Sequence, residues 1–166
     1  EILLQENTIL IASHSRSSNF PTTNGTLMTG LQDGIAVKLT EDLSSIIWST
    51  FFGGSGEETG NSIALSTDGN LYIAGGTSSN NFHFSGHDTS FDGDRDGYIL
   101  QLNAQTGAIV AGTYIGFSSY DQCYFVRTDL DNKVYVYGQT KTDWVITPGK
   151  YGNPNSGQFI NKYNAN

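Results

Sequence analysis

Apolar and polar residues alternate along several short segments of this chain. Leu71 and Ile73 flank Tyr72, and Ile63 and Leu65 repeat the same two-residue spacing. This period is typical of a β-strand with one face turned toward a core, and no long window keeps the 3.6-residue apolar stripe of an amphipathic helix. The sequence therefore predicts an all-β fold.

The strand pattern itself recurs at a fixed distance. Residues 71–77 (LYIAGGT) are echoed by residues 134–140 (VYVYGQT) and more weakly by residues 9–15 (ILIASHS), so that equivalent positions lie 60–63 residues apart. Each unit carries four short strand signals, which is typical of the four-stranded antiparallel blades of a β-propeller. A β-solenoid is the alternative, but the tight Asp68-Gly69 hairpin signal favours antiparallel neighbours.

The period divides the chain into about two and a half units. Residues 1–6 are predicted to end a preceding blade, residues 7–68 and 69–130 to form one blade each, and residues 131–166 to form the first half of a further blade. Propellers close with about four to eight blades. We therefore expect a β-propeller segment that forms an incomplete ring, with further blades on both sides.

Charge and composition exclude several classes of partner. Sixteen acidic and eight basic residues give a formal charge of −8, which disfavours binding to nucleic acid or to an anionic membrane. No apolar run approaches the roughly 20 residues of a membrane-spanning helix. The single cysteine, Cys123, excludes an internal disulfide and lies in an apolar segment, so we expect it to be a small core residue.

Aromatic residues recur in the long loops between the first and second strand of each unit. Phe20, Phe82 and Trp144 follow each other at a spacing of 62 residues. Two interpretations are open. The aromatic rings either anchor each loop against its own blade, or form a ligand-binding platform of the kind that carbohydrate-binding proteins use.

An acidic segment offers a candidate metal site. Asp92, Asp94 and Asp96 stand at alternate positions and are followed by Gly97, like the opening of a calcium-binding loop. The later ligands of such a loop are missing, and Asp96 with Gly97 also serves as the opening of a strand. Calcium binding and a solvated acidic turn, partly neutralised by Arg95, are both open, and no other cofactor is predicted.

No catalytic constellation is visible. Glu58 and Asp121 occupy equivalent positions in neighbouring units, which favours a role in capping backbone N–H groups of a turn over acid–base catalysis. There is no Ser/His/acid arrangement and no phosphate-binding loop. We therefore expect that the chain is not an enzyme.

Three longer segments together resemble the bacterial seven-bladed β-propeller repeat family, SBBP. They are residues 48–60 (WSTFFGGSGEETG), 68–75 (DGNLYIAG) and 96–103 (DGYILQLN). The resemblance implies a secreted or cell-surface bacterial protein, closest in style to the large type IX-exported surface proteins of gliding bacteria. The family carries no agreed catalytic residues that could be transferred.

These observations favour a non-catalytic extracellular segment that acts as a scaffold or an adhesion and interaction surface of a larger protein. A lectin-like, carbohydrate-binding propeller is the alternative. The expected partners are other blades of the same polypeptide or other surface proteins, with glycans as the alternative. Binding to nucleic acid and insertion into a membrane are not expected.

Overall fold

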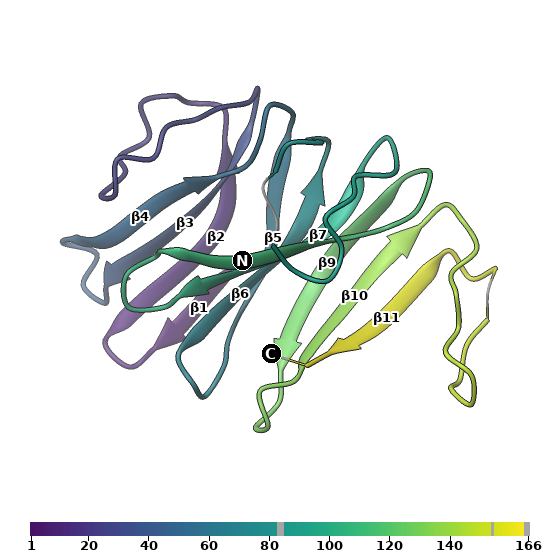
Figure 1. Ribbon diagram of the computed structural model, residues 1–166. Coiled ribbons are helices and arrows are strands. Elements are labelled where there is room, and N and C mark those ends of the chain that lie inside the picture. The colour runs from purple at the N-terminus through teal and green to yellow at the C-terminus, as the bar shows by residue number, and fades with distance from the viewer. Residues whose placement is uncertain (83–84, 154, 165–166) are drawn as a thin grey trace.

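The computed structural model describes residues 1–82, 85–153 and 155–164, and within these residues every regular element is a β-strand (Figure 1). The strands form three antiparallel sheets, which we call blades 1, 2 and 3. Blade 1 contains β1 (Ile2–Gln5), β2 (Thr8–Ser15), β3 (Asp33–Thr40) and β4 (Ile46–Phe52); blade 2 contains β5 (Glu58–Leu65), β6 (Asn70–Thr77), β7 (Asp96–Asn103) and β8 (Ile109–Ile115); blade 3 contains β9 (Asp121–Thr128), β10 (Val134–Thr140) and β11 (Gln158–Tyr163).

The predicted all-β architecture of four-stranded units is confirmed, and the sheets do not close into a ring. No helix in the described part of the chain is long and apolar enough to cross a membrane.

The blade boundaries lie one strand earlier than the predicted division at residues 6, 68 and 130. β1 pairs with β2, and β5 pairs with β6 rather than with the strands before it. A sequence period fixes the distance between equivalent strands but not the strand at which a unit begins. The hairpin turn between β5 and β6, in which Gly69 takes a φ of 83°, makes these two strands neighbours.

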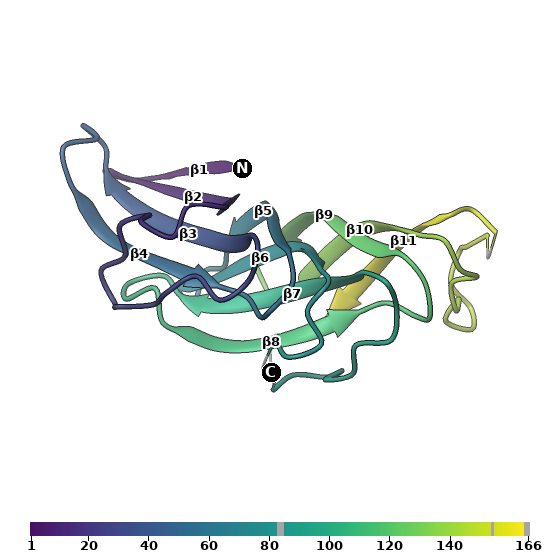
Figure 2. The same cartoon turned by 90° about the horizontal axis from the view of Figure 1, so that it is seen from above.

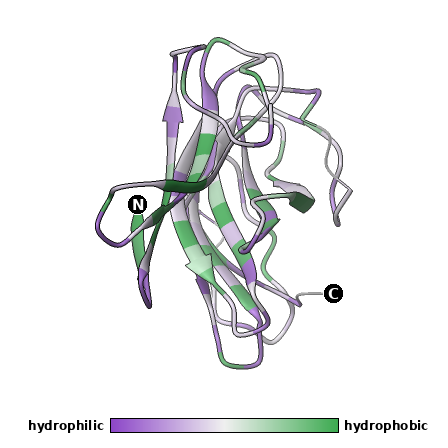
Figure 3. Ribbon diagram, turned by 90° about the vertical axis from the view of Figure 1, so that its left-hand side faces the viewer, coloured by the Kyte–Doolittle hydropathy of each residue, from purple (hydrophilic) through white to green (hydrophobic). Residues whose placement is uncertain are grey.

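The three sheets pack side by side, with the first strand of each on the same edge (Figure 2). We call the interface of blades 1 and 2 seam 1, and that of blades 2 and 3 seam 2. Each seam has its own apolar core, and the apolar positions lie mainly along the strands (Figure 3). The core of seam 1 includes Leu10, Trp48, Phe52, Ile73, Tyr98 and Leu100; that of seam 2 includes Ala74, Ile99, Cys123, Val126, Val136 and Phe159.

Burial distinguishes the middle blade from the last one. In β6 all residues from Leu71 to Thr77 are buried, because blade 2 is covered on both faces. In β10 buried residues alternate with half-buried ones, as expected for a sheet with one covered face. Cys123 is fully buried in seam 2, as predicted, and this burial raises the pKa of its thiol far above the usual value.

Candidate functional site

The loop aromatics lie at the seams between blades. Phe82 is buried at seam 1, where its ring lies 6.4 Å from that of Phe52 in blade 1 and 5.5 Å from that of Tyr98 in its own blade. Trp144 has the corresponding place at seam 2. Its ring stacks on Phe159 at 3.8 Å and meets the edge of Phe117, which precedes blade 3, at 5.2 Å.

These contacts modify the anchor interpretation. Phe82 is largely buried as expected, but Phe20 and Trp144 are only half-buried. Phe82 and Trp144 also contact residues that precede their own blade, whereas Phe20 contacts Phe51 within blade 1 at 5.6 Å. The rings of Phe82 and Trp144 therefore help to join neighbouring blades. Their use as a ligand platform stays a prediction.

Two hollows open between the blades. The hollow at seam 1 has a volume of about 290 Å³ and combines aromatic side chains, including Phe82, with the polar residues Thr26, Thr29 and Asp33. The hollow at seam 2, of about 260 Å³, is lined by Tyr72, His87 and Tyr163 among others. Phe82 is thus the predicted ligand-binding residue that lines the hollow at seam 1, whereas Phe20 and Trp144 line neither of these two hollows.

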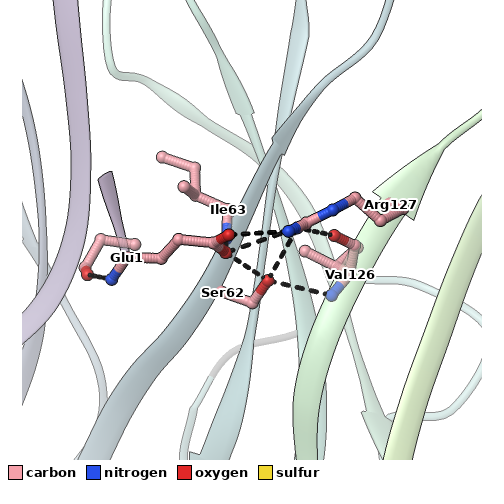
Figure 4. Close-up of polar contacts among 6 residues, drawn as sticks. Glu1, Ser62, Ile63, Val126 and Arg127 are labelled. Atoms are coloured by element: carbon pink, nitrogen blue, oxygen red, sulfur yellow. Dashed lines mark hydrogen bonds and ion pairs between the residues drawn. The ribbon is translucent and has the colours of Figure 1, made fainter. Parts of the chain in front are cut away.

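A polar network ties together the first strands of all three blades (Figure 4). The Glu1 carboxylate accepts hydrogen bonds from the Ser62 hydroxyl at 2.6 Å and the Ile63 amide at 2.9 Å, and pairs with Arg127 at 2.8 Å. Burial disfavours the charged form of Glu1, but the bonds from Arg127, Ser62 and Ile63 outweigh it and lower the pKa of this carboxyl. Sequence reasoning missed this network, because its members are far apart in the chain.

Two buried carboxylates lie at seam 1, each on the first residue of a strand. Asp33, which opens β3, accepts hydrogen bonds from the Thr29 amide and hydroxyl at 2.7 and 3.1 Å and from the Gly30 amide at 2.9 Å. Glu58, which opens β5, accepts one bond from the Gly54 amide at 2.9 Å. Its other oxygen accepts bonds from the hydroxyls of Thr77 and Ser79, both at 2.6 Å.

Asp96 and Asp121 form the equivalent pair at seam 2, where the Asp121 amide donates to the Arg95 carbonyl at 2.7 Å. Oδ2 of Asp96 accepts from the Asp92 amide at 3.0 Å, and Oδ2 of Asp121 accepts from the Phe117 amide at 2.8 Å. The predicted capping role of Glu58 and Asp121 is thus confirmed at both seams. Within the described residues, however, Oδ1 of both aspartates is buried without a hydrogen-bond partner.

Burial, with a smaller contribution from the negative charges of Asp121, Asp92 and Asp88, raises the pKa of the Asp96 carboxyl to about 6, and the hydrogen bond from the Asp92 amide opposes this shift. Asp96 is 1% exposed and Asp121 is fully buried. Seam 2 therefore places two carboxyl groups together in a poorly solvated environment. The repetition of Asp33 as Asp96, and of Glu58 as Asp121, was the sequence signal that could have revealed this pairing.

The predicted metal ligands do not form one group. Asp92 and Asp94 are exposed, whereas Asp96 turns into seam 2, and the described residues contain no cluster of three or more His, Cys, Asp or Glu side chains that could hold a metal ion. The sequence predicts that Arg95 neutralises this turn in part, but the Arg95 side chain is bound elsewhere. Its guanidinium donates to the Thr59 hydroxyl at 3.1 Å and to the Gly76 carbonyl at 3.0 Å.

Comparison with known proteins agrees with this architecture. Residues 47–83, which extend from β4 through β6, match the model of the SBBP family, described as a beta-propeller repeat. No curated protein matches the chain. The matched segment crosses seam 1 and includes Glu58 and the turn at Gly69, so the resemblance noted in the sequence is confirmed for the repeat itself.

Proposed function

We propose that this chain, which carries a β-propeller repeat, is a non-catalytic segment of an extracellular protein and serves as a scaffold or interaction surface. The observation that carries the proposal is an apolar row across the uncovered face of blade 3. Phe125, Tyr137 and Ile160 lie side by side there on three neighbouring strands. Phe125 is 56% exposed and Ile160 is 71% exposed.

The same row in blade 2 is an interface. Ser62, Ala74 and Ile99 are paired across β5, β6 and β7 in the equivalent register, and all three are buried. Ala74 and Ile99 belong to the core of seam 2. The exposed row on blade 3 therefore has the position through which one blade docks on the next, and at two of its three positions, Phe125 and Tyr137, the side chain is larger than the buried counterpart. Large exposed apolar patches mark interaction sites.

We infer that the partner on this face is another blade of the same polypeptide or another surface protein. The excess of acidic residues favours a protein partner over nucleic acid or an anionic membrane. Glu58 and Asp121 support a non-catalytic role, because their carboxylates accept the backbone hydrogen bonds that cap turns inside the seams.

Sedimentation of the isolated chain tests the docking surface. We expect the chain to associate, and replacement of Phe125 and Ile160 by Ser to shift it toward the monomer, because the apolar row is then lost. Leu130→Ser is the matched control, since Leu130 is 88% exposed but lies in the turn before β10. A wild-type chain that is a cooperative, stable monomer would contradict the proposal.

The extracellular location is tested on the protein in its native cells. We expect a protease added to intact cells, or fractionation of the medium, to reveal the chain outside the cytoplasm. Detection only after lysis would remove this part of the proposal while leaving the docking surface unaffected.

The carbohydrate-binding alternative has one structural support. In the loop between β10 and β11, Trp144 is half-buried and the Tyr151 ring is fully exposed. Binding on a glycan array that is abolished by Trp144→Ala, with Tyr124→Ala as a control away from this loop, would favour the lectin function. Absence of binding would leave the scaffold proposal in place.

A further inference from the structure

We propose that seam 2 holds a calcium ion between the carboxylates of Asp96 and Asp121. The two carboxylates come from different blades, β7 of blade 2 and β9 of blade 3, so the ion would join the blades. The site differs from the loop site predicted from the sequence, because it shares only Asp96 with that set.

The first support is the pair of buried oxygens without donors. A buried carboxylate oxygen that lacks a hydrogen bond is strongly disfavoured unless a cation or a proton compensates its charge. The two side chains converge on Gly116. A Cβ placed there would lie 2.9 Å from Oδ2 of Asp121 and 3.0 Å from Oδ1 of Asp96. Both carboxylates therefore border the same small space.

The second support is the difference from seam 1. There both carboxylate oxygens of Asp33 and of Glu58 accept hydrogen bonds, so no cation is needed. Glu58 is long enough to receive the hydroxyl groups of Thr77 and Ser79. At seam 2 the equivalent acid is Asp121, which is one methylene shorter. The equivalent hydroxyls, those of Thr140 and Thr142, lie 3.0 Å from each other instead. The Asp121 carboxylate therefore lacks the hydroxyl hydrogen bonds that Glu58 receives, and its Oδ1 stays without a donor among the described residues.

The local charge favours a divalent cation. Where seam 1 has Thr29, which donates to Asp33, seam 2 has Asp92, whose negative charge acts on Asp96. The nearest basic residue along the chain, Arg95, is engaged with Thr59 and Gly76. The site thus offers two buried carboxylates, a third carboxylate at the surface and nearby hydroxyl oxygens.

The donor set suits calcium better than magnesium. Calcium accepts irregular sets of carboxylate, hydroxyl and water oxygens, whereas magnesium requires near-octahedral geometry and gives up its water reluctantly. Two carboxylate ligands balance the charge of one calcium ion. With so few charged ligands, we expect an affinity in the weak range of calcium sites, with a Kd of about 0.1–1 mM.

The test is thermal unfolding of the full chain, dialysed against EDTA and titrated with calcium chloride at neutral pH. We expect the unfolding midpoint to rise and to saturate, since an ion that binds only the folded state stabilises it. Magnesium should have a much smaller effect. Terbium luminescence, sensitised by nearby tyrosines, and calorimetric titration with calcium give direct readouts of binding.

Three variants locate the site. Asp121→Asn should weaken the calcium response at least about tenfold, because it removes one of two charged ligands. Asp94→Asn is the matched control, since Asp94 is an exposed carboxylate of the same acidic turn and should leave the response unchanged. Asp121→Glu should raise the midpoint without calcium and lose the response, because the longer acid can reach the Thr140 and Thr142 hydroxyls as Glu58 does at seam 1.

Three outcomes would overturn the proposal. The first is no calcium-dependent change in either unfolding or terbium luminescence, which would assign the charge compensation to a proton shared by the aspartates. The second is an equal response to magnesium, which would indicate general screening of the acidic chain. The third is a response retained in Asp121→Asn and lost in Asp94→Asn, which would move the ion to the exposed turn.

Discussion

Seam 1 and seam 2 are built from equivalent positions but stabilise their buried carboxylates in different ways. At seam 1 Asp33 and Glu58 each accept three hydrogen bonds from neutral donors. At seam 2 Asp96 and Asp121 each accept one, and each keeps a buried oxygen without a donor among the described residues. The repeat thus preserves the position of the charge while the groups that compensate it vary.

Three pairs of equivalent residues differ in the side-chain groups that they place at the two seams. Asp92 replaces the hydroxyl donor Thr29, Asp121 replaces the longer Glu58, and Thr142 replaces Ser79. The backbone capping bond from the preceding loop survives in both seams, at 2.9 and 2.8 Å. Glu58 and Asp121 therefore both keep the backbone hydrogen bond that caps the turn, although Asp121 lacks the side-chain hydrogen bonds that Glu58 receives.

The largest expected effect concerns the aromatic residues of the two seams. Phe82→Ala should lower the free energy of unfolding by about 3–5 kcal/mol, because it leaves a cavity between Phe52 and Tyr98. Trp144→Ala should cost less, since Trp144 is half-buried. Urea unfolding of both variants measures the comparison. A neutral Phe82→Ala variant would show that the ring does not hold the seam.

The next effect concerns the length of the acid. Glu58→Asp should lower the free energy of unfolding by about 1–3 kcal/mol, because the Thr77 and Ser79 hydroxyls at seam 1 lose their buried acceptor. Asp121→Glu in calcium-free buffer should act in the opposite direction at seam 2. Chemical denaturation of the two variants tests this reciprocity, and destabilisation by both would show that hydroxyl donors do not explain the difference between the seams.

The smallest expected effect concerns how the stability of the metal-free protein depends on pH. The pKa of Asp96 in the folded state is about 6, above its ordinary value of 3.8. The folded chain therefore retains a proton that the unfolded chain releases, and the contribution of Asp96 to stability should fall as pH rises from about 4 to about 6.

Unfolding in EDTA-containing buffers across this range measures the slope, and Asp96→Asn should remove it. Lowered pKa values of Asp42, Asp68 and Asp129 act at lower pH and with the opposite sign, so the difference between wild type and variant isolates Asp96. Curves that coincide would show that Asp96 titrates normally in the folded chain.

The sequence by itself determined the all-β class, the spacing of the blades and the capping role of Glu58 and Asp121. These features rest on local patterns: two-residue alternation, a period of 60–63 residues and the Asp68-Gly69 turn. The period of the sequence does not show, however, at which strand a blade begins. Hydrogen bonding was needed to show that β5 belongs with β6 and that the three blades begin with β1, β5 and β9.

Only the tertiary structure decided which side chains meet at the seams. Read along the chain, Asp92, Asp94 and Asp96 form one acidic group, but folding leaves the first two in solvent and turns Asp96 toward Asp121. Glu1 and Arg127 meet in the same way across three blades. Such contacts depend on how the blades pack against each other. The repeat hints at the Asp96–Asp121 pair, but Glu1 and Arg127 are separated by so many residues that no local pattern connects them.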